Sequence, residues 1–207
     1  MFKLNVLGAS FLEQILQFDR SLFEVINRKG SSDFLDVVLP FLRESQFWIP
    51  FYLFMILFTT MNFKSKGWWW VLGFILTAAL ADIISSSVIK ETVMRIRPCR
   101  DPFLAGEVIF RARYCPKSSS FTSSHATSHF ALSMYIFQTL KGLSKWWCMI
   151  FLWAFAIIYT QVYVGVHYPL DVVCGALLGC IIGAFMAYMY VRQIGLIIFD
   201  QTTTPSR

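Results

Sequence analysis

Three short blocks of the sequence contain the residue types that bind and cleave a phosphate group. Lys90 is followed after six residues by Arg97-Pro98, His167 stands four residues before Asp171, and Ser123-Ser124-His125 lies between these blocks. A phosphate monoester carries up to two negative charges, and a lysine and an arginine offer it a point charge and a planar, bidentate donor. Each block adjoins a strongly apolar segment. The pattern predicts phosphate chemistry at a membrane edge, while the alternative for Lys90 and Arg97 alone is ordinary interfacial anchoring.

The pair His167 and Asp171 has the arrangement expected of a nucleophile and its orienting carboxylate. Pro169 suits the first turn of a helix, so Asp171 falls in that turn and can reach back to the imidazole. A carboxylate on one ring nitrogen fixes the tautomer and leaves the other nitrogen nucleophilic. A carboxylate at the start of a membrane segment is costly without a partner, and the pairing supplies that partner.

Ser123, Ser124 and His125 begin an apolar segment and offer further phosphate contacts. Serines are strong helix N-caps, and capping alone is the alternative for them. A helix start also presents free N–H groups to an anion, and His125 there could donate a proton to a leaving oxygen. His129 follows one turn later, but no third residue completes a metal-ligand set with this pair. We therefore expect no metal and no cofactor, and we expect His129 to be a hydrogen-bonded interior residue.

The composition indicates an integral membrane protein with one domain. Hydrophobic residues make up 57% of the 207 residues and charged residues 14%, against roughly 45–50% and about 25% in soluble domains. The net charge of +6 is dispersed along the chain, which argues against nucleic acid as a partner and fits loops beside anionic lipids. The predicted partners are membrane lipids and a lipid phosphate substrate, and the pattern specifies no oligomeric state.

Five apolar segments predict an all-α bundle of about five transmembrane helices. They cover residues 46–62, 68–89, 125–140, 146–166 and 168–191, and each is close to the ~20 residues that cross the hydrocarbon core. The third segment contains Ser, Thr and His, so we expect it to face the bundle interior. The last segment contains glycines at four-residue spacing, which predicts close helix packing: Gly175, Gly179 and Gly183.

Two flanking regions complete the single domain. Residues 1–45 precede the bundle, which covers residues 46–192, and a polar tail of residues 193–207 follows it. Apolar residues recur at helical spacing from Phe11 to Ile26, which predicts an amphipathic helix at the membrane interface. Gly30-Ser31-Ser32-Asp33 breaks this helix, and a second short helix is expected over Phe34–Leu42.

Basic residues in the short loops predict the orientation in the membrane. Five of them fall on one side of a five-span bundle, which places that side in the cytoplasm: Lys64, Lys66, Lys141, Lys145 and Arg192. The loop 90–124 and the turn at His167 then lie on the periplasmic or extracellular face, and a bacterial inner membrane is the expected location. Cys99 and Cys115 bracket this loop, where they either form a disulfide on the oxidising face or remain free thiols.

Together the three blocks resemble the signature of the type-2 phosphatidic acid phosphatase family, membrane relatives of the vanadium haloperoxidases. The family motifs are K-x6-RP, PSGH and SR-x5-H-x3-D. The first is complete in Lys90 and Arg97-Pro98, the second is Thr122-Ser123-Ser124-His125, and the third is Thr160-Gln161 with His167 and Asp171 at the family spacing. The order and spacing agree across residues 90–171, and the apolar spans suit the helical bundle of the family.

The resemblance implies a metal-independent phosphatase that works through a phosphohistidine. His167 would attack phosphorus, Asp171 would orient His167, and His125 would protonate the leaving oxygen. Four residues would hold the phosphate: Lys90, Arg97, Ser123 and Ser124, the last through its backbone amide. Gln161 stands where the family has an arginine; its amide can still donate hydrogen bonds, but loss of one oxyanion donor can cost about 10²–10³ in rate. Four loop arginines are candidates to compensate: Arg95, Arg100, Arg111 and Arg113.

The predicted function is hydrolysis of a lipid phosphomonoester or diphosphate, with undecaprenyl diphosphate as the first choice of substrate. Phosphatidylglycerol phosphate, phosphatidic acid and the lipid A phosphates fit the same expectation. Two alternatives share the scaffold. One is a phosphotransferase that passes the phosphoryl group from His167 to another lipid, and the other is a lipid-phosphate binder without turnover.

Overall fold

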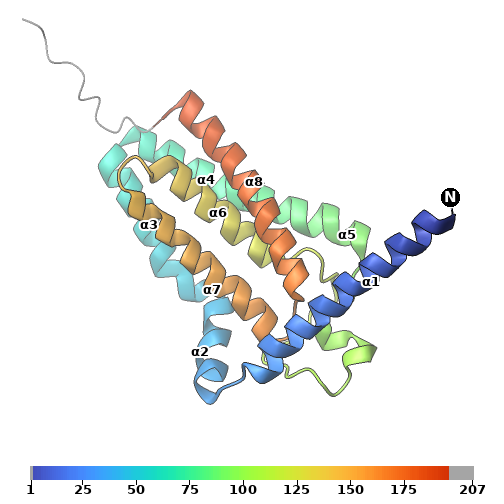
Figure 1. Cartoon of the computed structure of the whole chain (residues 1–207). Coiled ribbons are helices and arrows are strands. Elements are labelled where there is room, and N and C mark those ends of the chain that lie inside the picture. Colours follow the sequence, from blue (N-terminus) through green and yellow to red (C-terminus); the bar gives the residue numbers. More distant parts are fainter. Residues whose placement is uncertain (1, 196–207) are drawn as a thin grey trace, which may run out of the picture.

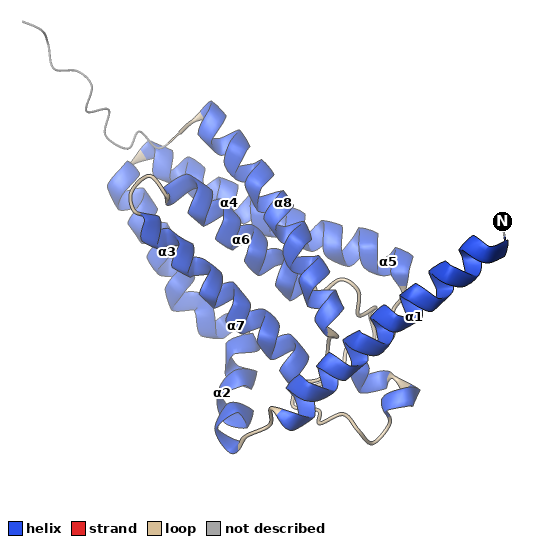
Figure 2. Cartoon of the chain, in the orientation of Figure 1, coloured by secondary structure: helices blue, strands red, loops and turns tan. Residues whose placement is uncertain are grey.

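The computed structural model describes residues 2–195, and every regular element in this part of the chain is a helix (Figure 1, Figure 2). The predicted all-α class is therefore confirmed. Most of the predicted tail, 193–207, lies outside the described residues.

Two helices precede the bundle, as the amphipathic pattern predicts. Helix α1 (Phe2–Glu24) runs obliquely across the end of the bundle at which α7 ends and α8 begins (Figure 1). It continues into a π-helical turn, Val25–Lys29, and α2 then covers Asp33–Arg43. The hydroxyl of Ser32 caps α2 by accepting a hydrogen bond from the Leu35 amide at 3.3 Å. The predicted break and second helix are therefore confirmed.

The bundle consists of α3 (Ile49–Phe63), α4 (Ser65–Ile83), α6 (Ser124–Leu140), α7 (Ile150–Tyr163) and α8 (Pro169–Gln193). A π-helical segment, Ile84–Ile89, joins α4 to the one-turn helix α5 (Lys90–Val93). Among the described residues, four helical stretches are long and apolar enough to cross a membrane: Ser45–Phe63, Ser65–Val93, Lys145–Tyr163 and Pro169–Gln193.

Helix α6, which corresponds to the predicted third span, is the central helix of the bundle. It has 17 residues and packs against α4, α7 and α8. Most of its residues are buried, including the polar Thr127, Ser133 and Thr139. The expectation of an interior helix is confirmed. However, α6 is not among the four stretches that are long and apolar enough to cross a membrane, so the described residues contain four such spans where the sequence predicts about five.

Glycines bring α8 into close contact with α6. A Cβ added to Gly179 would lie 2.3 Å from the carbonyl oxygen of Thr127, and one added to Gly183 would lie 2.2 Å from that of Ala131. No side chain fits in this space, so the predicted packing role of these glycines is confirmed. The contact continues to the helix starts, where the Ser123 amide donates to the carbonyl of Asp171 at 3.2 Å. The second and third blocks of the sequence therefore meet at one end of the bundle.

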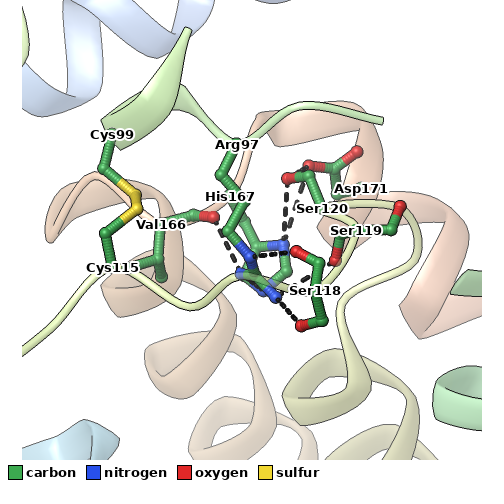
Figure 3. Close-up of a disulfide and its surroundings, with 9 residues drawn as sticks. All are labelled: Arg97, Cys99, Cys115, Ser118, Ser119, Ser120, Val166, His167 and Asp171. Carbon is green, nitrogen blue, oxygen red and sulfur yellow. Dashed lines mark hydrogen bonds and ion pairs between the residues drawn. A yellow bond between two sulfur atoms is a disulfide. The ribbon is translucent and has the colours of Figure 1, made fainter. Parts of the chain in front are cut away.

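The long loop between α5 and α6 folds over this same end. It contains two short 3₁₀ turns, Pro98–Arg100 and Pro102–Leu104, and a disulfide joins Cys99 to Cys115 (Figure 3). Asn27 in the N-terminal region fixes the loop, because its side chain accepts from the amide of Ile109 at 2.9 Å and donates to the Ile109 carbonyl at 2.8 Å. The loop thus brings the first block to the starts of α6 and α8.

Candidate active site

His167 lies in the tight turn between α7 and α8, at the centre of the residues brought together here (Figure 3). Only 3% of its surface is exposed. The amides of Val166 and His167 both donate to the carbonyl of Gln161 at 3.3 Å. The last turn of α7 therefore fixes the backbone from which the imidazole projects.

The hydrogen bonds around His167 assign its tautomer. The Nη1 atom of Arg97 donates to Nε2 of the imidazole at 3.0 Å, so Nε2 carries a lone pair and Nδ1 carries the proton. Nδ1 faces Asp171 Oδ2 at 3.6 Å and the hydroxyl oxygen of Ser120 at 3.4 Å (Figure 3). This tautomer is the one in which Nε2 can act as a nucleophile.

Asp171 is completely buried and has more partners than the sequence predicts. Its Oδ2 atom accepts from the Ser120 hydroxyl at 2.5 Å and from the Tyr168 amide at 2.9 Å, and its Oδ1 atom accepts from Arg95 at 2.6 Å. The capping of α8 by its own Asp171 and the long-range bond to Arg95 hold the carboxylate rigidly beside the His167 ring. A buried carboxylate is tolerated when both of its oxygens accept hydrogen bonds, as they do here.

Arg95 joins Asp171 to the N-terminal helix. Its Nη2 atom donates to Asp19 Oδ2 at 2.5 Å, and its guanidinium lies 4.2 Å from the centre of the Tyr168 ring. Asp19 in turn accepts from the amide of Leu170 at 2.7 Å. Burial alone would lower the pKa of Arg95, but the carboxylates of Asp171 and Asp19 outweigh it and raise that pKa. Helix α1 is therefore tied to the first turn of α8.

Arg97 is held by the loop that follows the disulfide. Its Nε atom donates to the Ser118 carbonyl at 2.9 Å, its Nη2 atom to the Ser119 carbonyl at 3.1 Å, and its Nη1 atom to the Val166 carbonyl at 3.1 Å. Burial lowers the pKa of Arg97 to about 10, so the guanidinium is charged at neutral pH. A full positive charge therefore lies in contact with the lone pair of His167.

Lys90 and the serines of the second block lie at the start of α6. The ammonium group of Lys90 donates to the hydroxyl of Ser124 at 2.6 Å, and this hydroxyl lies 2.9 Å from that of Ser86. The hydroxyl of Ser123 is buried and caps α6 by accepting from the Ala126 amide at 3.4 Å. The side chain of Ser123 therefore acts as a helix cap, which is the alternative given for the serines above. The Ser124 side chain has a different role, because its hydroxyl binds Lys90.

His125 stands in the first turn of α6, directly after Ser124. Its ring is parallel to that of His129, with 6.2 Å between the ring centres. His129 is bonded through Nδ1 to the carbonyl of His125 at 2.7 Å and packs edge-on against Trp153. His129 is therefore the hydrogen-bonded interior residue that the sequence predicts, and His125 is the histidine of α6 nearer the helix start.

A cavity of about 630 Å³ opens beside these residues. Five basic side chains line it: Lys90, Arg95, Arg97, Arg100 and Lys117. Glu91 is the acidic residue in the lining. Among the described residues, no carboxylate lies within ion-pair distance of Arg100 or Lys117. The disulfide joins the two chain segments that contain Arg100 and Lys117. The cavity wall therefore has an excess of positive charge.

Several site residues were missed by sequence reasoning. Ser120 and Asp19 carry no motif, and Arg95 was recognised only as one of four loop cations. Arg43, at the end of α2, lies outside every motif, yet its Nε atom donates to Oε1 of Gln161 at 3.3 Å. No local signal identifies these residues, because each acts across a long stretch of chain.

This fold and site define a class of protein, the membrane-embedded phosphatases with a His–Asp pair at the end of a helical bundle. The chain belongs to the PAP2 superfamily, which it matches over residues 68–194. It is 27% identical over 180 residues to the lipid A 4'-phosphatase of Bacteroides thetaiotaomicron, covering 85% of this chain and 78% of that protein. It is 29% identical over 170 residues to the undecaprenyl-diphosphatase of Sulfolobus acidocaldarius, covering 81% and 76%.

Solved structures agree with this assignment. Aquifex aeolicus LpxE superposes with a TM-score of 0.58 at 27% identity, covering 81% of this chain and 93% of that one. A PAP2-type phosphatidylglycerolphosphate phosphatase from Bacillus subtilis gives a TM-score of 0.55 at 21% identity, covering 84% and 87%, and shows the shared fold. The resemblance seen in the three motifs is confirmed, and the protein is a membrane lipid phosphatase of the PAP2 type.

The environment of His167 predicts an unusual pH dependence. Burial, aided by the charge of Arg97 and opposed by Asp171, lowers the pKa of His167 to about 4. The imidazole is then neutral above this value, so the ionisation of His167 is expected to cause no loss of kcat/KM between pH 7 and about 5 and a decline near pH 4, whereas an ordinary histidine would become protonated below about 6.5. The measurement is kcat/KM against pH, corrected for the ionisation of the substrate phosphate near pH 6 by a separate ³¹P titration. A corrected acid limb centred at or above pH 6 would contradict the expectation.

Proposed function

We propose that this phosphatase hydrolyses the phosphate ester of a lipid whose headgroup is large and carries more than one anionic group, as the lipid A phosphates do. The observation behind this choice is the basic cavity beside His167. Arg100 and Lys117 lie in its wall, beyond the cations of the first motif, and have no carboxylate partner within the described residues. A substrate with a second anionic group could bind these two side chains while its scissile phosphate lies at His167.

The relatives support the same choice. Lipid A 4'-phosphatases from Bacteroides thetaiotaomicron and Porphyromonas gingivalis align with 85% and 88% of this chain. The sequence pattern led to undecaprenyl diphosphate as the first choice, and an undecaprenyl-diphosphatase aligns with 81% of the chain. The cavity of about 630 Å³ is within the range of sites that enclose a ligand, which favours a sugar headgroup over the slender diphosphate of a carrier lipid.

In the proposed reaction, Nε2 of His167 attacks phosphorus while the bond from phosphorus to the lipid oxygen breaks. His125 gives a proton to that oxygen, and a phosphohistidine remains. A water molecule, deprotonated by His125, then attacks phosphorus, and the P–N bond breaks to release inorganic phosphate. Arg97 and Lys90 neutralise the charge on the phosphoryl oxygens, and Arg97 exchanges its bond to His167 for bonds to the phosphate.

We further propose that the site lies on the periplasmic side of a bacterial inner membrane. The basic residues of the short loops support this orientation. The disulfide between Cys99 and Cys115 supports it independently, because disulfides persist on oxidising faces of membranes. The site would then act on lipids of the outer leaflet.

A substrate panel tests the proposed function. The purified protein in detergent is given lipid A, undecaprenyl diphosphate, phosphatidylglycerol phosphate and phosphatidic acid, and release of inorganic phosphate is measured. We expect the highest kcat/KM with lipid A, inhibition by vanadate as a mimic of pentavalent phosphorus, and no loss of rate with a chelator. A higher kcat/KM on phosphatidic acid would overturn the headgroup assignment, and the absence of phosphate release from all four lipids would overturn the hydrolase itself.

A further inference from the structure

We infer that Arg43, at the end of α2, supplies the positive charge that the third motif lacks at Gln161, and that Gln161 holds this guanidinium at the phosphate site. The inference rests on the proposed phosphatase function and adds to it a phosphate-binding residue from outside the three motifs. Arg43 also lies outside residues 68–194, over which the chain matches its superfamily. The N-terminal region would then complete the active site.

The first support is the contact between the two side chains. Arg43 Nε donates to Gln161 Oε1 at 3.3 Å across 118 residues of sequence. Gln161 is completely buried, and its backbone carbonyl accepts the amides of Val166 and His167. The residue that fixes the His167 turn through its backbone therefore binds Arg43 through its side chain.

The second support is that both side chains keep unused donors. Nε2 of Gln161 is buried without a hydrogen-bond partner, and an unsatisfied buried amide is costly. In the described part of the chain, the Nη atoms of Arg43 have no hydrogen-bond partner, and no carboxylate lies within ion-pair distance of them. A phosphate oxygen bound here would satisfy the amide and neutralise the guanidinium together.

The third support comes from two of the candidate loop arginines, Arg95 and Arg111, which are already paired with carboxylates. Arg95 binds two carboxylates, and Arg111 Nε lies 2.6 Å from Asp36 Oδ1. In contrast, the charge of Arg43 acts on Arg97: burial lowers the pKa of Arg97, the carboxylate of Asp171 opposes this effect, and Arg43 adds to it. Among the described residues, neither Arg43 nor Arg97 has a carboxylate within ion-pair distance. An anion bound by both guanidinium groups would relieve their mutual repulsion.

The position of α2 explains how Arg43 reaches this place. Leu39 is buried against the end of α7 and the residues after it, including Tyr163 and Val166. Asp36 accepts a hydrogen bond from the Tyr163 hydroxyl, which ties the middle of α2 to the last turn of α7. Arg43 follows one turn after Leu39, so it lies beside Gln161, two residues before Tyr163. The packing of α2 against α7 thus carries the arginine to the third motif.

The test moves the charge from one position to the other. Four variants are purified: Arg43→Ala, Arg43→Lys, Gln161→Arg and the double variant Arg43→Ala/Gln161→Arg. Their kcat and KM for a lipid phosphate and their Ki for vanadate are measured. Arg28→Ala is the matched control, because Arg28 belongs to the same N-terminal region but forms only exposed pairs with Glu24 and Glu107.

We expect Arg43→Ala to lower kcat/KM by about 10²-fold, the usual cost of one lost oxyanion donor, and to raise the Ki for vanadate. Arg43→Lys should keep part of the rate, because the charge remains while the bond to Gln161 is lost. Gln161→Arg should reduce activity when Arg43 is present, since two guanidinium groups then compete for one place. The same substitution should raise kcat/KM by at least about tenfold in the Arg43→Ala background, and Arg28→Ala should match the wild type.

Two outcomes would overturn the inference. The first is an Arg43→Ala variant with the wild-type kcat/KM and Ki. The second is an Arg43→Ala variant with reduced activity, an unchanged Ki for vanadate and no recovery by Gln161→Arg, which would mean that Arg43 only supports the fold. If the wild type hydrolyses no lipid phosphate, the proposed function fails. In that case, vanadate binding is measured by calorimetry to test whether Arg43 binds the anion. Weaker binding by Arg43→Ala than by the wild type would support this role, and equal binding would overturn it.

Discussion

Replacement of His167 by alanine is expected to lower kcat for phosphate release by at least about 10⁴-fold, because it removes the atom that accepts the phosphoryl group. His125→Ala should also lose most of the activity on a lipid, about 10²–10⁴-fold, through loss of the general acid. Asp171→Asn should cost less than His167→Ala, because it disturbs the orientation of the nucleophile and not the nucleophile itself. The measurement is the rate of phosphate release for each variant at one saturating lipid concentration.

Two further measurements separate the roles of the two histidines. Substrate labelled with ³²P and quenched in alkali should leave an acid-labile phosphohistidine on the wild type and none on His167→Ala. With p-nitrophenyl phosphate, whose leaving group departs without protonation, His125→Ala should regain formation of the labelled intermediate and accumulate it. His129→Gln serves as the control, because His129 is bonded to the helix backbone and should leave the labelling intact. Labelling that persists in His167→Ala would show that another residue is the nucleophile.

The sequence predicts the parts of this site that depend on local spacing. Lys90 and Arg97 are both found at the cavity, and His167 and Asp171 face each other because the first turn of α8 brings Asp171 back toward the residues that precede the helix. The glycines of α8 predict close helix packing, and the structure shows that the partner is α6. The polar residues of the third segment predict that it faces the bundle interior, and α6 does so. The sequence does not identify α4, α7 and α8 as the helices that pack against it.

Contacts that span the chain could not be predicted in this way. Asp19 falls on the polar side of an amphipathic helix, where an aspartate is usually solvated, yet only 3% of its surface is exposed because Arg95 binds it. The pairing of Arg43 with Gln161 likewise depends on the packing of α2 against α7. A single sequence gives the periodicity of a helix face but not the partner that covers it. For this reason the sequence points to four loop arginines for the role that we infer for Arg43.

Arg95→Ala is expected to destabilise the protein by about 3–5 kcal/mol, because it leaves two buried carboxylates without their shared cation. The exposed fractions of the side chains are 17% for Arg95, 4% for Asp19 and 0% for Asp171, so the two carboxylates are almost completely shielded from solvent while the guanidinium is in place. The free energy of unfolding in detergent is the measurement, followed by tryptophan fluorescence. Arg28→Ala is the comparison, since its pairs are exposed and should contribute no more than about 1 kcal/mol.

A double variant identifies the cause of this loss. Asp19→Asn removes one of the two uncompensated charges, so Arg95→Ala/Asp19→Asn should recover part of the stability that Arg95→Ala loses. Activity should recover less, because Arg95 also holds Asp171 beside the His167 ring and the remaining bond from Leu170 to residue 19 cannot replace that contact. We therefore expect kcat of the double variant to stay well below the wild type at a temperature where both are folded. Equal stability of Arg95→Ala and Arg28→Ala would show that the Asp19–Arg95–Asp171 cluster contributes little to the fold, and α1 would then have no part in positioning the start of α8.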